Sequence, residues 1–351
     1  MILVHGWPDL SFGWRYQVPF LRGLLGGGLR VVVPDMLGYG RTDAPDAVEE
    51  YSMKKIAGAL AKLAEHVAGK GEKVILGGQY VFPFLASFPF LGISHRGGGG
   101  FELYNCSAAA NEIFSRTSEA DQRHSDWGGA VVWKTTIWHP HLVRAVFSVC
   151  TPYVPPRDTY MALEDVVKVL PNFRYQLQLA GPDVEAAIVG RAKLRQFLCA
   201  MYSGRTPSGE SGFTTADGVL FRNLDAIGPS PLITPEETDF YADEYARHGM
   251  HGPLNWYRTT RVNFEEEKVL LDEGPARTRI SAPSLMVTAS ADSALPPSMA
   301  AAMDRYFDDL TKGEVQAGHW ALWQAPEEVN RHVGEFLTRV LEGGCEQASR
   351  L

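Results

Sequence analysis

The sequence predicts an α/β fold: a mostly parallel sheet flanked by helices, with a helical cap inserted into it. Short apolar runs typical of buried strands alternate with amphipathic helical patterns, which is the order expected of a parallel sheet. A largely helical stretch from about residue 151 to 262 interrupts this alternation. The 351 residues can bury a substantial core, and 45% hydrophobic and 21% charged residues are ordinary values for a globular protein.

We expect the strands where short β-type runs occur. These runs are Ile2–Val4, Arg30–Val33, Lys73–Leu76, Val143–Val149 and Ser284–Thr288. The chain begins inside the first run, and a motif follows that run at once. Because a sheet of this type usually has further strands before this point, we expect the chain to be truncated at its N-terminus.

Three segments carry helix signals. In the first, apolar residues recur at spacings of three and four at Ile56, Leu60, Leu63 and Val67. In the second, which follows Ala325, the same rhythm places Val329, Val333, Phe336 and Val340 on one stripe. The third is a helix start over residues 234–237, with Thr as N-cap, Pro in the first turn and Glu at the third position.

These patterns divide the chain into three parts. Residues 1–151 form the first part of an α/β core, and residues 263–351 form its second part. Residues 152–262 open with Pro152, Pro155 and Pro156 and contain few β-type runs, so we interpret them as a helical cap, or lid. We found no internal repeat.

Residues 79–125 are an anomalous insertion. A buried strand ends upstream in Gly77-Gly78, and a helix begins downstream at Trp127. Removal of residues 79–124 would give Gly-Gly-Ser-Asp-Trp-Gly-Gly, a sharp strand–turn–helix of the kind that exposes a nucleophile above a parallel sheet. Such a turn needs small residues two before and two and three after the nucleophile. In the chain as it stands, His124 occupies the first of these positions.

Two explanations of the insertion stay open. It could be a translated intron, because an intron could begin inside a codon for Gln79 and end inside a codon for Ser125. Splicing inside those codons would write a single His before Asp126. It could also be a real surface insertion after a strand, since long loops do occur.

Charge and cysteine content exclude several classes of function. The net charge of −8 and the lack of a basic cluster argue against nucleic-acid binding. No apolar run reaches the length of a membrane span, and we expect no secretory signal. The cysteines have no metal spacing, which favours reduced thiols; they are Cys106, Cys150, Cys199 and Cys345. The C-terminal Ser349-Arg350-Leu351 is similar to a peroxisomal address, so an import receptor is an expected partner and the location is peroxisomal or cytoplasmic.

Four motifs in order predict a nucleophile–acid–histidine triad. His5-Gly6-Trp7-Pro8 follows the first strand, and Asp126 stands at the interrupted turn. Asp292 follows a later strand, and His319 lies in a Gly-His-Trp before the last helix. This is the order of the α/β-hydrolase triad. No G-x-S-x-G occurs, which disfavours a serine enzyme.

The chain resembles an epoxide hydrolase of the α/β-hydrolase superfamily. The resemblance rests on the strings HGWPD, VVVPDMLGYGRTDAP, DWGGAVVW, FRYQLQ, GPLNWYR and GHW, which span nearly the whole chain outside the insertion. In that family two cap tyrosines hold the epoxide oxygen, and their motifs match at Tyr175 and Tyr257. The sequence departs from the family pattern at Ser125, where His usually precedes the nucleophile, and in the missing N-terminal strands.

The resemblance implies a two-step reaction. Asp126 would attack the epoxide carbon while the tyrosines donate to the departing oxygen. His319, oriented by Asp292, would activate the water that cleaves the ester to a vicinal diol. Trp7 and Trp127 would supply the backbone N–H groups of the oxyanion hole. The supporting motif residues are His5, Gly6, Pro8, Gly128 and Gly129. We expect a small-molecule epoxide and water as reactants, with no metal and no organic cofactor.

Other functions and other roles stay open. A haloalkane or haloacid dehalogenase shares the Asp nucleophile and the His–Asp pair, but it does not need two acidic tyrosines. The chain could also be a catalytically inactive protein of this fold, because the turn is interrupted. Among single residues, Asp126 could be an N-cap, Asp292 a turn residue, and Tyr175 and Tyr257 core aromatics. We interpret Asp35 as a brace for its loop. Solvated or capping roles are expected for His139, His141, His248 and His251.

Overall fold

The computed structural model describes the backbone of residues 1–79 and 127–348, with side chains as far as residue 342. Residues 80–126, which include most of the expected insertion together with Asp126, lie outside the described residues. The same holds for the C-terminal Ser349, Arg350 and Leu351.

The core is a five-stranded sheet in which all neighbouring strands are parallel. Its strands, in spatial order, are β1 (Ile2–Val4), β2 (Val74–Gln79), β3 (Val143–Val149), β6 (Ser284–Ala289) and β7 (Leu310–Val315). Every residue of the two strands β1 and β2 is buried, as expected for a sheet covered on both faces. The α/β fold with a mostly parallel sheet, predicted from the alternation of patterns, is therefore confirmed.

The strand predictions succeeded except at two places. The expected strand Arg30–Val33 is wrong, because this segment forms only an isolated bridge between Val32 and Ile2. Two backbone hydrogen bonds hold the bridge, and Pro34, which has no N–H to donate, follows at once. The strand β7 was missed because its sequence, LTKGEV, is half-exposed at the edge of the sheet and is not an apolar run.

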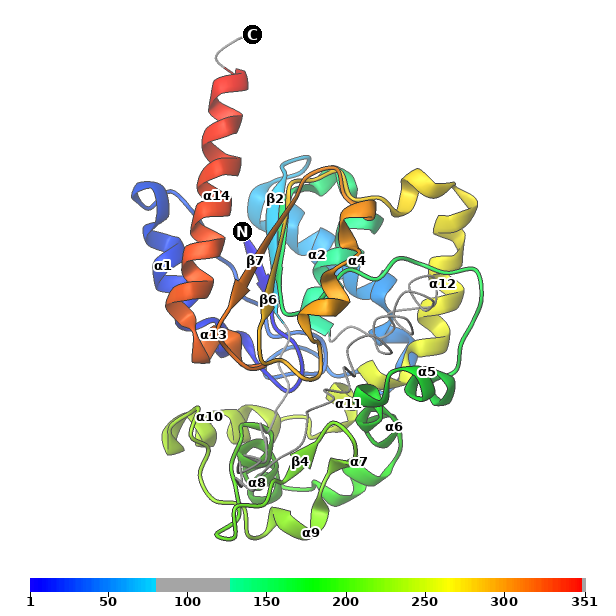
Figure 1. Cartoon of the computed structure of the whole chain (residues 1–351), viewed down its shortest axis with the longest axis vertical. Coiled ribbons are helices and arrows are strands. Elements are labelled where there is room, and N and C mark those ends of the chain that lie inside the picture. Colours follow the sequence, from blue (N-terminus) through cyan, green and yellow to red (C-terminus); the bar gives the residue numbers. More distant parts are fainter. Residues whose placement is uncertain (80–126, 349–351) are drawn as a thin grey trace, which may run out of the picture.

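The helices alternate with the strands and cover both faces of the sheet. They are α1 (Gln17–Gly23), α2 (Met53–Ala68), α4 (Trp127–Trp138), α5 (Leu163–Val169), α6 (Tyr175–Ala180), α7 (Asp183–Ala187), α8 (Arg191–Met201), α9 (Phe221–Leu224), α10 (Pro235–Tyr245), α11 (His251–Arg258), α12 (Thr260–Asp272), α13 (Ala321–Gln324) and α14 (Pro326–Ala348). Short 3-10 helices span Ser11–Trp14, Leu24–Gly26, Val48–Tyr51, Pro140–Leu142, Pro171–Phe173, Pro275–Thr278, Pro297–Ala300 and Met303–Tyr306. Figure 1 shows α2 and α4 on one face of the sheet and α1 and α14 on the other.

The three helix signals are confirmed, with local reasons for each boundary. The helix α2 begins after Ser52, whose side chain accepts a hydrogen bond from the Lys55 backbone N–H, and it ends at Gly69 with φ of 105°. The helix α10 begins with a complete capping box between Thr234 and Glu237. The helix α14 buries Val329, Val333 and Phe336 against the sheet side of the core.

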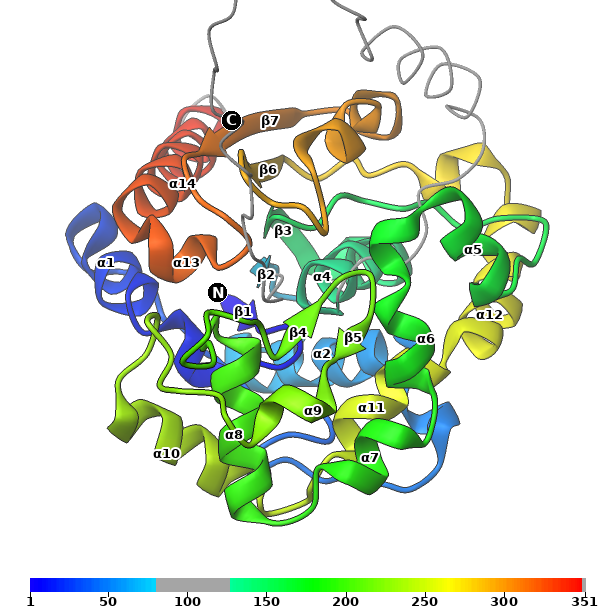
Figure 2. The same ribbon diagram turned by 60° about the horizontal axis from the view of Figure 1, so that its bottom comes forward.

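The segment from α5 to α11 lies beyond one end of the strands, at the bottom of Figure 1. In Figure 2 this segment comes forward, with α8, α9 and a two-stranded ribbon in front of the strands. The ribbon pairs β4 (Phe213–Thr214) with β5 (Gly218–Val219) in antiparallel fashion. We keep the division into core and cap, with the cap at residues 152–262, as a proposal. In the described part of the chain, no helix is both long and apolar enough to cross a membrane.

Candidate active site

The carboxyl ends of the parallel strands bring the expected site residues to one edge of the sheet. His5 follows β1, Asp292 follows β6, and His319 follows β7. The helix α4 begins at Trp127, beside the ends of β1 and β2. In open α/β sheets this edge is the usual place for a ligand.

Asp292 and His319 form a buried hydrogen-bonded pair. His319 Nδ1 lies 2.5 Å from Asp292 Oδ2, and both side chains are fully buried. The other carboxylate oxygen accepts the backbone N–H groups of Ala294 and Leu295, each at 2.9 Å, which fixes the carboxylate in place. Burial lowers the pKa of His319 although Asp292 opposes this effect. The ring is therefore neutral near pH 7, with Nδ1–H donated to Asp292 and the lone pair on Nε2, as a general base requires.

The glycines beside the expected nucleophile are in the close contact that a sharp turn demands. A Cβ on Gly78 would lie 2.4 Å from the carbonyl oxygen of Gly128, and a Cβ on Gly128 would lie 2.2 Å from that of Gln79. A Cβ on Gly129 would lie 2.3 Å from the Ser148 hydroxyl oxygen. The end of β2 and the start of α4 are thus in close contact, and Gly78 is the residue that would stand two before Asp126 if residues 79–124 were removed.

The regular sheet reaches the first residue of the expected insertion. We expected the anomalous segment to begin at Gln79, but Gln79 is the last residue of β2 and pairs with Val149. Its side-chain amide also donates to the carboxylate of Asp9. The regular sheet therefore extends one residue into the expected insertion, and Asp126 at its other end lies outside the described residues.

Three aromatic side chains join the core loops to the cap above this edge. The rings of Trp7 and Trp127 each lie 5.3 Å, centroid to centroid, from the ring of Tyr257, and both contacts are T-shaped. Trp7 follows β1, Trp127 begins α4, and Tyr257 belongs to α11. The two residues expected to form the oxyanion hole are thus brought to the same place as one of the two tyrosines.

The two tyrosines are brought together as the motifs predict. The ring centroids of Tyr175 and Tyr257 are 6.4 Å apart, and the rings meet at 76°. Both side chains are buried. Gln176 donates its side-chain N–H to the Tyr175 hydroxyl oxygen at 3.1 Å. In this bond the phenol oxygen is the acceptor.

The remaining motif residues support the loop after β1. His5 Nε2 accepts the backbone N–H of Met36 at 2.9 Å, and burial lowers the pKa of His5, so the ring is a neutral link between two loops. Asp35 accepts the backbone N–H groups of Ser11 and Arg41, which confirms its role as a brace. The Trp7–Pro8 peptide bond is cis.

Two further polar residues lie at the site without having been assigned a role. Asp9, the last residue of HGWPD, is fully buried and accepts the Tyr241 hydroxyl at 2.5 Å. Burial raises the pKa of Asp9 to about 7, although the hydrogen bonds from Tyr241, Leu10 and Gln79 oppose the shift. Cys150 has φ of 66°, and its thiol hydrogen-bonds to Asp292 while burial raises the pKa of that thiol. The sequence signal was available only for Asp9, as a carboxylate within a recognised motif.

One member of the histidine pairs makes a contact between helices. His251 Nδ1 lies 2.8 Å from a carboxylate oxygen of Glu185, so this histidine joins α11 to α7, although 37% of its side chain is exposed. His139 and His141 contact each other with centroids 6.1 Å apart. Within residues 1–79 and 127–348, no group of three metal-ligating side chains comes together.

An apolar cavity of about 120 Å³ lies against Trp127 between α4 and α12. Its lining includes Met53, Pro156, Met161 and Phe264. Lys134 and Glu267, which also belong to the lining, form a buried ion pair with 2.6 Å between Nζ and the carboxylate oxygen. Cavities of this character accommodate apolar parts of small ligands.

Comparisons with known proteins define first the class and then the family. The model of the α/β hydrolase family matches residues 1–79. Epoxide hydrolase srdG of Neurospora crassa is 37% identical over 347 residues, covering 97% of this chain and 87% of that protein. Bifunctional epoxide hydrolase 2 of Mus musculus is 30% identical over 96% of this chain, which spans about half (51%) of the mouse protein.

A solved structure supports the same fold. Epoxide hydrolase A from Mycobacterium thermoresistibile superimposes with a TM-score of 0.66 at 24% identity, covering 96% of this chain and 90% of that one. Fold and sequence thus place the chain among the α/β hydrolases. Within them, it belongs to the epoxide hydrolases, as the resemblance in the motifs implied.

Proposed function

We propose that this chain converts an epoxide to a vicinal diol at the carboxyl edge of the sheet. The observation that carries the proposal is that the ends of the parallel strands hold a buried His319–Asp292 pair at the same edge of the sheet where α4 begins. At the start of α4, Trp127 contacts Tyr257, which in turn contacts Tyr175. A serine hydrolase would not need the tyrosines, and neither would a dehalogenase. Membership of the epoxide hydrolases supports the same activity.

In the first step, Asp126 acts as the nucleophile. A carboxylate is ionised at neutral pH without a base, and backside attack on the saturated epoxide carbon forms an ester as the carbon–oxygen bond breaks. Tyr175 and Tyr257 donate to the departing alkoxide, and one of them transfers its proton. Phenols with pKa near 10 are suited to this strongly basic leaving group.

In the second step, water cleaves the ester. His319 Nε2 takes a proton from water, and the hydroxide attacks the ester carbonyl carbon while Asp292 stabilises the resulting imidazolium. The backbone N–H groups of Trp7 and Trp127 hold the oxyanion, and loss of one such donor costs roughly 3–4 kcal/mol in other hydrolases. The tetrahedral intermediate collapses with cleavage of its bond to the diol oxygen, and the proton of the new Asp126 carboxyl group passes to that oxygen. The diol leaves with one oxygen from Asp126 and one from the epoxide. The proton on His319 returns to the tyrosinate through solvent.

The experiment compares the whole chain with matched variants in an aryl epoxide assay. Wild type should release diol, whereas Asp126→Asn and His319→Gln should not. Tyr175→Phe and Tyr257→Phe should each slow epoxide opening strongly. If both tyrosine variants kept full epoxide activity, the proposed site would be wrong. If they lost little while a haloalkane released halide, the chain would be a dehalogenase.

A deletion variant tests the role of the insertion. Because Gly78 already lies close to Gly128, removal of residues 79–124 should put Ser125 in the place of Gln79 at the end of β2 and join that strand to α4. Activity that appears only in the deletion variant would support the hypothesis of a translated intron. A message that retains the segment, together with full activity of the intact chain, would contradict it.

We also propose import into peroxisomes through Ser349, Arg350 and Leu351. The helix α14 ends at Ala348, immediately before this tripeptide. A fluorescent protein fused in front of the chain should collect in peroxisomes and lose that location when the last three residues are removed. A diffuse signal from the intact fusion would favour a cytoplasmic enzyme.

A further inference from the structure

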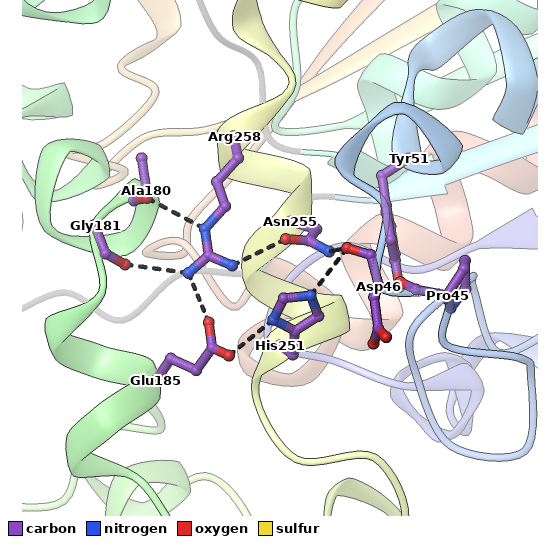
Figure 3. A network of polar contacts seen from close by, with 9 residues as sticks. All are labelled: Pro45, Asp46, Tyr51, Ala180, Gly181, Glu185, His251, Asn255 and Arg258. Carbon is purple, nitrogen blue, oxygen red and sulfur yellow. Dashed lines mark hydrogen bonds and ion pairs between the residues drawn. The ribbon is translucent and has the colours of Figure 1, made fainter.

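The two tyrosines belong to neighbouring cap helices that a single arginine connects. Tyr175 is the first residue of α6, and Tyr257 lies near the end of α11. Arg258, directly after Tyr257, reaches across to the far end of α6 (Figure 3). Its Nε donates to the carbonyl oxygen of Ala180 and its Nη2 to that of Gly181, both at 3.2 Å. The guanidinium thus caps carbonyls that the end of α6 leaves without intrahelical partners.

The rest of the guanidinium is held from two further sides. Nη1 donates to the Asn255 side-chain oxygen at 2.9 Å, within α11. Nη2 also lies 2.8 Å from a carboxylate oxygen of Glu185 in α7. The side chain of Arg258 is only 18% exposed. All three guanidinium nitrogens donate, a pattern that the planar guanidinium allows and a lysine ammonium cannot reproduce.

The helix α11 has its own attachment to the core. The Asn255 side chain donates to the Asp46 carbonyl oxygen at 3.1 Å, and Trp256 Nε1 donates to the Leu37 carbonyl oxygen at 3.0 Å. His251 adds a bond to the same Asp46 oxygen at 3.0 Å. These contacts set the place of Tyr257 relative to the core loops without using Arg258.

The helix α6 is attached in a different way. The backbone N–H of Tyr175 donates to Thr215 in the cap ribbon, and the side chain of Gln178 bonds to Val219 in the same ribbon. These partners belong to the cap, and the start of α6 is tied to the core by Asn172, whose side chain donates to the Ala294 carbonyl oxygen at 2.6 Å. The far end of α6, at Ala180 and Gly181, is where Arg258 bonds. Arg258 provides a polar link from the end of α6 to α11.

We infer that Arg258 is a positioning residue for epoxide opening, which sets the distance between the hydroxyl groups of Tyr175 and Tyr257, and that Glu185 holds its guanidinium in place. The inference rests on the proposed function, in which both hydroxyls donate to one oxygen. A displacement of about 1 Å in a reacting group can cost roughly 100-fold in rate. Loss of Arg258 should therefore slow ester formation by about that factor and leave ester hydrolysis at His319 unchanged.

The test is a double-mutant cycle with Arg258→Met, Tyr175→Phe and the double variant. Single-turnover tryptophan fluorescence and quenched-flow mass spectrometry measure ester formation and ester hydrolysis separately. Arg195→Met is the matched control, because Arg195 bonds to Asp239 at 2.7 Å between two other cap helices. Thermal unfolding of every variant checks that the cap is folded.

If Arg258 acts through the tyrosine, its replacement should cost far less in the Tyr175→Phe background than in the wild type. Arg258→Lys should keep more of the rate of ester formation than Arg258→Met does, but less than the wild type. Arg195→Met should form the ester at the wild-type rate. Equal losses in both backgrounds, or equal slowing of both steps, would overturn the inference. If Tyr175→Phe alone had no effect, the proposed role of the tyrosines would fail, and that result is distinguishable from a failure of the inference.

Discussion

Replacement of Asp292 by Asn should separate the two chemical steps. The Asn side-chain oxygen can still accept the N–H groups of Ala294 and Leu295, so the turn keeps its shape. Its amide, however, presents N–H groups to Nδ1 of His319, where the carboxylate of the wild type accepts a hydrogen bond from Nδ1–H at 2.5 Å. The neutral ring should shift its proton to Nε2, the atom required as base.

The expected magnitude follows from the loss of the correct tautomer. In a serine protease the corresponding change lowers turnover about 10⁴-fold, which corresponds to roughly 5 kcal/mol of lost transition-state stabilisation. The defect should fall on ester hydrolysis alone, because attack by Asp126 needs no base. The ester should therefore accumulate in Asp292→Asn.

The assay is rapid mixing with an aryl epoxide followed by intact-mass measurement. Asp292→Ala is the comparison, since it also leaves two buried backbone N–H groups without acceptors, at about 1–3 kcal/mol of stability each. It should lower the unfolding temperature more than Asp292→Asn does. The reasoning is refuted if Asp292→Asn hydrolyses the ester at the wild-type rate, or if ester formation slows as much as hydrolysis.

Three further predictions concern stability. Gly128→Ala should lower the free energy of unfolding by about 1–3 kcal/mol or more, measured by thermal unfolding, because the added Cβ would meet backbone atoms. Its control is Gly58→Ala, where the added Cβ in α2 would meet open space; this variant should raise the free energy of unfolding by roughly 1 kcal/mol. Bonds to Asp46 and Glu185 raise the pKa of His251. These bonds therefore stabilise the fold fully below the pKa that His251 has in the unfolded chain, and their contribution falls as the pH rises through the raised pKa. Glu185→Gln should flatten this dependence of the free energy of unfolding on pH, measured by urea unfolding, and an unchanged dependence would contradict the assignment. Burial raises the pKa of Asp9 from 3.8 to about 7, so stability should decrease as pH rises between these values, and a decrease of the same size in Asp9→Asn would exclude this carboxyl as the cause.

The sequence predicted the sheet and the helices best where burial is continuous. The strands β2 and β3 read as apolar runs because both of their faces are covered. The edge strand β7 was not predicted, because its alternate residues face solvent and a glycine interrupts its sequence. Residues 30–33 were wrongly predicted as a strand, because β propensity alone does not supply a neighbouring strand to pair with. Of these residues only Val32 pairs with β1.

The site was predictable as far as its motifs carry a fixed spacing. Strand, turn and residue type together pointed to Asp292 and His319, and parallel topology brought them to one edge. The cap residues required the family resemblance, because nothing in the local pattern separates Tyr175 from a core aromatic. The roles of Glu185, His251 and Arg258 depend on contacts between helices far apart in sequence, which no spacing rule reveals.

The transfer of an oxygen atom from Asp126 to the product tests the central claim most directly. A single turnover of enzyme in excess over epoxide, run in ¹⁸O-labelled water, should release diol without label and leave the label in the peptide that contains Asp126. The diol would carry the epoxide oxygen and one carboxylate oxygen. Label in the first-turnover diol, with none in that peptide, would mean that water attacks the epoxide directly and would contradict a covalent intermediate at Asp126.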